Sequence, residues 1–351
     1  MENRSYHELQ EILSIKDVRE YLSNLPQFVT TYFRGIEHNT QPRTRRGYAL
    51  DLTIFFNWLH EVNPAMKKKE IKQISLEDLS SLQVFDIEEY MDYLKLYESS
   101  NGREVTNSNS SIKRKMSALR GLYAYLYKNN MVTANPTVQI NMPKLHEKAI
   151  IRFDADEIGR FLDTVDGGAT NMSNRQKKAH EQNRTRDLAL MTLLLGTGIR
   201  VSECVGLDLK DVDMKNTRIK VTRKGGYEAF VYFGDEVAAA LLPYLEDREN
   251  ITDIVMGHED ALFVSGQKKR LCVKSVENLV KKYATQVTSL KHITPHKLRS
   301  TYGTALYKET GDIYLVADVL GHKDVNTTKK HYAAIEDERR ENAKNAVHLR
   351  N

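Results

Sequence analysis

Four short segments of this 351-residue chain carry side chains that could do chemistry on a phosphodiester. They read GTGIRVSE, RKGG, TPHKLR, and LGH followed by a tyrosine ten residues after its histidine. Their ionisable groups are guanidiniums, a carboxylate, an ammonium, imidazoles and a phenol, at Arg200, Arg299, Glu203, Lys224, His296, His322 and Tyr332. A phosphodiester is a stable anion that repels nucleophiles, so cleaving it without a metal requires several fixed cations around the phosphorus.

The spacing within these segments suits that task. Arg200 and Arg299 can each present a planar fork to two phosphate oxygens and stay charged. Glu203 comes one helical turn after Arg200 and could orient its guanidinium. His296 and Arg299 are three residues apart and would project from one turn of a helix toward the same target. Taken singly, each residue also fits a plain role as a surface charge or a structural histidine.

Other chemical motifs are incomplete or absent from the sequence. The GTG of the first segment has Val201 where a dinucleotide-binding loop has its third glycine, and it follows a predicted helix rather than a strand. No phosphate loop of the nucleotide-hydrolysing type occurs. The histidines at positions 292, 296, 322 and 331 match no metal-binding spacing. We therefore expect neither a bound metal nor a cofactor.

In this order and with these intervals, the four segments resemble the tyrosine recombinases (the phage-integrase family), and in particular their Xer-like bacterial members. The likeness covers nearly the whole chain from about residue 26. It departs in one respect, because the interval from His322 to Tyr332 is one residue longer than in many relatives. The resemblance implies a helical core-binding domain and a catalytic domain that close on DNA as a C-shaped clamp.

The resemblance also implies that Tyr332 is the nucleophile. Its phenol would attack the phosphorus and form a covalent 3′-phosphotyrosyl link, which stores the bond energy so that no ATP is required. Arg200 and Arg299 would stabilise the developing charge, and His322 would donate a hydrogen bond to a non-bridging oxygen.

Proton transfer would depend on the hairpin and on the TPHKLR segment. By resemblance, Lys224 is the general acid that protonates the 5′ leaving oxygen, with its neighbour Arg223 as a rival for that position. His296 would assist proton transfer with the nucleophile. A 5′ hydroxyl of another strand would then reverse the step and rejoin the DNA.

The activity implied is site-specific DNA recombination through a Holliday junction. Four subunits would assemble on two synapsed sites, from a monomer or weak oligomer when free, with an accessory or regulatory protein as a further candidate partner. Xer-like chromosome dimer resolution, and with it chromosome partition at cell division, is one alternative, and integration of a mobile element is the other. The sequence shows no evident arm-binding domain before about residue 26, which favours the first. A type IB topoisomerase and a non-catalytic DNA-binding protein are less favoured alternatives.

Positive charge is concentrated in parts of the chain. The net charge is +5, whereas the window 110–150 alone contains seven basic residues and one acid, Glu147. Such segregation favours a polyanionic partner, although a charge run is also typical of a solvated helix face. We expect contacts to double-stranded DNA from the basic residues Arg43, Arg45, Arg46, Lys113, Arg114, Lys115, Arg120, Arg223, Lys268, Lys269 and Arg270.

Hydrophobic periodicity predicts a mainly α chain with a small β-sheet (α+β). Apolar stripes over 48–59 and 112–126 indicate two amphipathic helices, the aromatic run FFNWL of the first being core packing, and 87–97 is predicted as a shorter acidic helix. The second half has predicted helices at 153–165, 188–195, 273–287, 299–310, 313–320 and 335–347. Alternation over 218–223, a Gly225–Gly226 turn and a strand at 229–233 predict a β-hairpin. The polar stretch 167–186 is predicted as a loop or exposed insertion.

Proline pairs and a basic linker divide the chain. The predicted parts are an N-terminal extension (1–25), a core-binding domain (26–142), a linker (143–150), a catalytic domain (151–334) and a tail for subunit contacts (335–351). The longest apolar stretch, 188–199, is shorter than the about 18–20 residues of a membrane span. Two cysteines cannot staple a chain of this size. We therefore expect a cytoplasmic, nucleoid-associated protein that does not bind a membrane.

Overall fold

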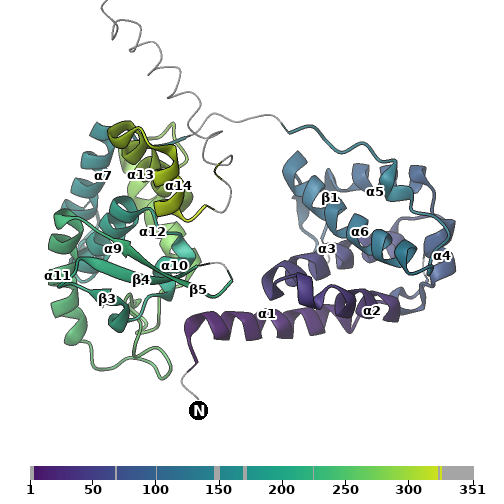
Figure 1. The fold of residues 1–351 in the computed structure, drawn as a ribbon, viewed down its shortest axis with the longest axis horizontal. Helices are drawn as coiled ribbons and strands as arrows, with labels where there is room; N and C mark the ends of the chain where they lie inside the picture. The colour runs from purple at the N-terminus through teal and green to yellow at the C-terminus, as the bar shows by residue number, and fades with distance from the viewer. Residues whose placement is uncertain are drawn as a thin grey trace, which may run out of the picture. The chain divides into compact units, whose positions relative to one another are not determined.

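The structure is a computed structural model that describes residues 4–67, 69–99, 101–145, 151–168, 172–223, 225–322 and 325. The chain forms two compact units, Met1–Lys148 and Ala149–Asn351 (Figure 1). Both are mainly helical and each contains a small antiparallel sheet, which confirms the α+β class. Lys224, Tyr332 and the predicted tail lie outside the described residues.

The first unit is a helical bundle with one short hairpin. Its helices are α1 (Tyr6–Leu22), α2 (Gln27–Gly35), α3 (Pro42–Glu61), α4 (Leu76–Ser81), α5 (Val84–Tyr93) and α6 (Asn109–Lys128). The two apolar stripes of the sequence lie on α3 and α6, so both predicted helices are confirmed. Strands β1 (Leu96–Glu98) and β2 (Glu104–Thr106) pair antiparallel.

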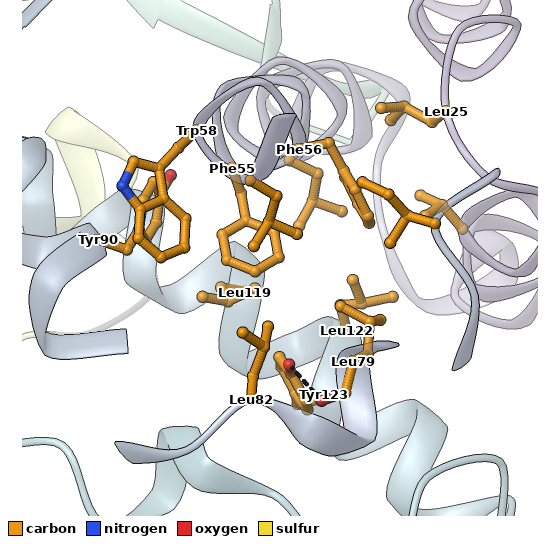
Figure 2. Close-up of a cluster of buried hydrophobic side chains, with 14 of the residues drawn as sticks. Leu25, Phe55, Phe56, Trp58, Leu79, Leu82, Tyr90, Leu119, Leu122 and Tyr123 are labelled. Atoms are coloured by element: carbon orange, nitrogen blue, oxygen red, sulfur yellow. Dashed lines mark hydrogen bonds between the residues drawn. The ribbon is translucent and has the colours of Figure 1, made fainter. Parts of the chain in front are cut away.

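Aromatic side chains of α3, α5 and α6 meet in the core of this unit (Figure 2). Phe55 and Trp58 of α3 are buried and stacked, with ring centroids 6.0 Å apart. Tyr90 of α5 meets the Phe55 ring edge to face at 5.0 Å. Tyr123 of α6 is also buried, and its hydroxyl donates a hydrogen bond of 3.1 Å to the carbonyl of Leu79. The FFNWL run is therefore core packing, as predicted.

Two predictions for the first half need comment. The helix predicted over 87–97 is wrong in its second half, because α5 ends at Tyr93 and the chain turns into β1. The amide of Asn107 donates to the carbonyl of Leu94 at 2.8 Å and stabilises this turn, a contact that residue periodicity cannot reveal. The segment 1–25 contains α1, which begins at a capping box between Ser5 and Glu8 and packs along α3.

The second unit surrounds one buried helix, α9. Its helices are α7 (Ala155–Gly167), α8 (Asn174–Glu181), α9 (Arg184–Thr197), α10 (Val201–Gly206), α11 (Asp235–Glu249), α12 (Val273–Val287), α13 (Pro295–Thr310) and α14 (Ile313–Leu320). Helices α7, α11 and α13 pack directly on α9. A three-stranded antiparallel sheet has the order β3 (Val212–Asp213), β4 (Arg218–Arg223), β5 (Tyr227–Tyr232), which confirms the predicted hairpin (Figure 1).

The polar stretch 167–186, predicted as a loop or exposed insertion, is helical over most of its described length, and all of α8 except His180 is exposed. Helix α8 begins at a capping box between Ser173 and Gln176, and its buried His180 lies 3.1 Å from the carbonyl of Asp166. The start of α9 also falls in this stretch, where Asp187 accepts a 2.8 Å hydrogen bond from the hydroxyl of Tyr283. Because His180 is the one buried residue of α8, this helix has no apolar stripe that a sequence search could find.

The described residues include no helix that is both long and apolar enough to cross a bilayer.

Replacing Phe55 by Ala should lower the free energy of unfolding of the first unit by about 3–5 kcal/mol, because the lost ring leaves a cavity between α3 and α5. Trp58 is the sole tryptophan of the chain and packs on Phe55, so urea unfolding followed by its fluorescence reports on this unit. Phe85→Ala is the matched control, since that ring is 65% exposed and its loss should change stability by less than about 0.5 kcal/mol. Equal unfolding midpoints for the two variants would contradict the packing described.

Candidate active site

Arg200 precedes α10 and is fixed by a buried acid. Its backbone N–H donates to Oε2 of Glu203 at 2.8 Å, and its Nη1 donates to Oε1 of the same carboxylate at 2.7 Å. The Glu203 side chain is 4% exposed, whereas that of Arg200 is 35% exposed. The contact that the spacing predicts is thus present, and it holds a guanidinium with one side open to solvent.

Arg299 lies on α13 and is buried. Its Nη1 donates to the carbonyl of Gly198 at 2.6 Å, and its Nη2 donates to the carbonyl of Leu320. Gly198 ends α9 in the left-handed conformation (φ +62°), and Leu320 is the last residue of α14. Carbonyls at helix C-termini lack intrahelical partners and carry partial negative charge. They therefore suit a buried guanidinium.

The end of α14 brings the two arginines together. Nη2 of Arg200 donates to the carbonyl of Gly321 at 3.2 Å, next to the Leu320 carbonyl that Arg299 binds. His322 follows directly, and its backbone N–H donates to the carbonyl of Ala317 at 2.9 Å. Arg200, Glu203, Arg299 and His322, which the sequence singled out from three separate segments, therefore meet at one place.

His296 lies in the first turn of α13, one turn before Arg299, and its side chain is exposed. Pro295 occupies the first position of that helix, where its missing backbone N–H costs no hydrogen bond. Lys224 and Tyr332 lie outside the described residues, so their roles stay predictions.

Arg223 ends β4 and reaches the same helix end. Its Nη1 donates to the carbonyl of Asp318 at 3.4 Å and its Nη2 to that of Val319 at 3.1 Å. The sequence predicts Arg223 as a DNA contact or as a rival general acid. The structure gives its guanidinium an internal partner, the last turn of α14.

Basic residues of the first unit that the sequence predicts as DNA contacts include two with buried side chains. Arg45 donates to the carbonyl of Glu37 at 2.8 Å, and Lys115 donates to Oδ1 of Asn107 at 3.0 Å. Burial lowers the pKa of the Lys115 ammonium below its ordinary value. Charge alone predicts that Arg45 and Lys115 contact phosphates. In the structure both side chains are buried and donate to groups of the protein itself.

Arg120 and Arg270 also donate to backbone carbonyls. Nη2 of Arg120 reaches the carbonyl of Ile140 at 2.7 Å, and Nη1 of Arg270 reaches that of Leu207 at 2.8 Å. Both side chains thereby tie distant segments of one unit together, as structural arginines do.

The other predicted DNA contacts lie closer to solvent. Arg46, Arg114 and Lys268 form ion pairs with Asp17, Asp51 and Asp253. The side chains of Arg43, Lys113 and Lys269 are exposed. The basic residues predicted as DNA contacts thus fall into three groups. Some donate hydrogen bonds to groups within their own unit, some form ion pairs nearer the surface, and some are exposed.

The main-chain carbonyls of Gly198, Leu320 and Gly321 are the groups that sequence reasoning missed. They orient both arginines, yet a carbonyl belongs to every residue type and leaves no compositional trace. One sequence signal could have located these carbonyls. A glycine just after a predicted helix marks the C-terminus of that helix, where the last carbonyls have no partner within the helix. Tyr302 packs beside Gly198, and burial raises the pKa of its phenol. Within the described ranges, no three histidine, cysteine or acidic side chains gather to bind a metal.

Comparison with known families agrees with this arrangement. The sequence model described as "Phage integrase family" matches residues 152–339, more than half of the chain. The chain belongs to the phage integrase family. A second model, "Phage integrase, N-terminal SAM-like domain", matches residues 29–130. The family identification made from the motifs is confirmed, and the chain is a tyrosine recombinase, an enzyme that cleaves and rejoins DNA at specific sites.

Individual relatives of this recombinase match over most of its length. Tyrosine recombinase XerS of Streptococcus thermophilus (strain CNRZ 1066) is 32% identical, and the match covers 93% of this chain and 97% of the relative. The fold resembles that of XerH in a post-cleavage complex with palindromic difH substrate (TM-score 0.63, 19% identity, 95% of this chain and 96% of that one). It also resembles lambda integrase in a tetramer bound to a Holliday junction (TM-score 0.61, 15% identity, 87% and 76%).

Replacing Glu203 by Ala should slow DNA strand cleavage by about 10–100-fold, the usual effect of losing a partner that orients a charged ligand. The Arg200 guanidinium would lose the buried carboxylate that orients it. DNA binding should persist, because the exposed cations of the chain are unchanged. Single-turnover cleavage of a nicked recombination site, with a gel-shift assay beside it, separates chemistry from binding. Glu277→Ala removes an acid from an exposed pair of the same spacing and should leave cleavage unchanged. A cleavage defect no larger than that of the control would refute the orienting role.

Proposed function

We propose that this recombinase is an Xer-type enzyme that exchanges DNA strands in chromosome dimer resolution. The observation that supports it best is the fixation of Arg200 and Arg299 around one helix end, next to His322. Two guanidiniums held by internal partners are preorganised for the dianionic, five-coordinate phosphorus of strand cleavage. Coverage of 97% of an Xer relative's length supports this subtype over a mobile-element integrase.

In the proposed reaction the phenol oxygen of Tyr332 attacks the phosphorus. A Tyr–O–P bond forms, the P–O5′ bond breaks, and the 5′ oxygen takes a proton from Lys224. Arg200 and Arg299 stabilise the charge on the non-bridging oxygens, with a hydrogen bond from His322. His296 assists transfer of the phenol proton. The reverse attack by a 5′ hydroxyl of the partner strand restores a phosphodiester.

The proposed assembly is a tetramer on two synapsed DNA sites, which the tetrameric state of lambda integrase on a Holliday junction supports by analogy. Residues 26–142 would bind DNA as one half of the clamp and 151–334 as the catalytic half, joined by 143–150. The segment 335–351 would dock on a neighbouring subunit. Action on chromosomal DNA would place the protein in the cytoplasm, at the nucleoid.

Replacing Tyr332 by Phe should abolish covalent protein–DNA adducts and leave DNA binding intact, because only the attacking oxygen is lost. The measurement is trapping on a nicked site, read on a denaturing gel, with a gel-shift assay as the binding control. Adducts of wild-type protein mapped on genomic DNA test the subtype, and a single chromosomal locus is expected. Adducts that persist in the variant would overturn the nucleophile, and adducts at the ends of mobile elements would overturn the subtype.

The exposed cations Arg43 and Lys113 are the proposed phosphate contacts of the first unit. The guanidinium of Arg114, the residue after Lys113, lies over α3, where Gly47 leaves room for it, and buried Asp51 holds it in place. These side chains fit a surface on α3 and α6 that positions the protein on the DNA backbone.

Replacing Arg43 and Lys113 together by Ala should weaken binding about equally on all sequences and reduce the slope of log K against log salt by about two. Gel-shift titrations at several salt concentrations give this slope. Lys95→Ala removes an exposed lysine that is paired with Asp92 on acidic α5, so it should leave the slope unchanged. An unchanged slope in the double variant would exclude these two residues from the DNA interface.

A further inference from the structure

The last turn of α14 is bound by three arginines that come from three different parts of the second unit. The four consecutive carbonyls from Asp318 to Gly321 all accept hydrogen bonds from guanidinium groups. Arg299 donates to the carbonyl of Leu320 and Arg200 to that of Gly321, and both arginines belong to the proposed phosphate site. Arg223 donates to the first two carbonyls, those of Asp318 and Val319, and the proposed reaction assigns Arg223 no role.

The Arg223 contact is built closely into the fold. Gly321 ends α14 in the left-handed conformation (φ +62°), and a Cβ atom at this position would overlap the Arg223 guanidinium. Any larger residue at 321 would therefore strain the backbone and displace Arg223. The arginine fork also suits the task, because two nitrogens can bind two neighbouring carbonyls while a lysine ammonium acts as one point.

Arg223 is the last residue of β4, at the turn end of the β4–β5 hairpin and directly before Lys224. Arg223 pairs with Tyr227 across the hairpin, and the carbonyl oxygen of Arg223 accepts a 3.2 Å hydrogen bond from the backbone N–H of Gly226. Tyr227 is 72% exposed, so little packing supports this end of the hairpin. Figure 1 shows the hairpin extending past α10 away from the body of the unit. The hydrogen bonds of Arg223 to α14 connect the turn end of the hairpin to the helix that leads into His322.

We propose that Arg223 is a positioning residue that sets the hairpin, and with it the general acid, against the phosphate site. Its two hydrogen bonds to α14 fix the distance between the turn end of the hairpin and the helix end that Arg200 and Arg299 also bind. Loss of Arg223 would let the hairpin move and would slow protonation of the 5′ oxygen, while the two phosphate-binding arginines stay in place. This inference rests on the proposed function, in which Lys224 of the hairpin is that acid.

The test compares two DNA substrates in single-turnover cleavage at saturating protein. One has the natural 5′ oxygen at the scissile phosphate, and the other has a bridging 5′ sulfur. When the P–S bond breaks, the thiolate leaves without needing a proton, so a variant that lacks only the general acid regains its rate. Arg223→Ala should cleave the oxygen substrate about 10–100-fold more slowly than the wild type and the sulfur substrate at nearly the wild-type rate.

Three comparison variants make the result specific. Lys220→Ala removes a positive charge from the same strand, where it pairs with Glu228, and should cleave both substrates normally. Arg299→Ala should be slow on both substrates, because its role is at the phosphate. Arg223→Lys keeps the charge but cannot span both carbonyls, so it should behave like the alanine variant.

The outcomes separate this inference from the proposed function. Rescue of both Arg223→Ala and Lys224→Ala by sulfur supports both. Rescue of Arg223→Ala alone assigns the proton transfer to Arg223 itself, and overturns both Lys224 as the acid and the positioning role. A slow Arg223→Ala that sulfur does not rescue shows that Arg223 acts elsewhere, and overturns the inference whatever Lys224 does. Normal cleavage of the oxygen substrate by Arg223→Ala or Arg223→Lys also overturns it.

Discussion

Hydrogen bonds from guanidinium groups to helix-end carbonyls determine the geometry of the site. A buried charge is costly unless fixed dipoles or counter-charges replace its hydration. For Arg299 the carbonyls of Gly198 and Leu320 supply such dipoles, so the cation can sit inside the protein. Because those carbonyls end α9 and α14, the positions of both helices and of the arginine depend on one another.

The same rule accounts for other polar groups inside the two units. Asp51 is buried in α3, and burial raises its pKa while the nearby Arg114 acts in the opposite direction. Asp187 at the start of α9 accepts hydrogen bonds from Arg186 and from the hydroxyl of Tyr283. Each buried carboxylate thus fixes the partner that satisfies it. In the candidate site, buried Glu203 does this for Arg200, and so a cation that the sequence predicts to be catalytic is oriented by ordinary folding energetics.

Elements with a regular pattern could be predicted from the sequence, and irregular ones could not. The stripes on α3 and α6 and the alternation in β4 reflect one apolar face against one core, so periodicity finds them. The hairpin of β1 and β2 has three residues in each strand, too few for a period to show. Helix α8 has a polar sequence and packs through His180, so no stripe marks it. The DNA contacts predicted from basic residues were the least accurate predictions. Charge alone does not distinguish Arg43, which is exposed, from Arg45, which is buried.

By itself, the sequence determined the family, the chemistry and the identity of the candidate residues, because a metal-free attack on a phosphodiester requires particular side chains in a recognisable order. Only the tertiary structure decided what holds them. The groups that orient Arg200, Arg299 and Arg223 are mainly backbone carbonyls at the end of α14, more than ninety residues away in the chain from Arg223. Every residue has such a carbonyl, and it becomes a binding group only where a helix ends and another segment folds against it.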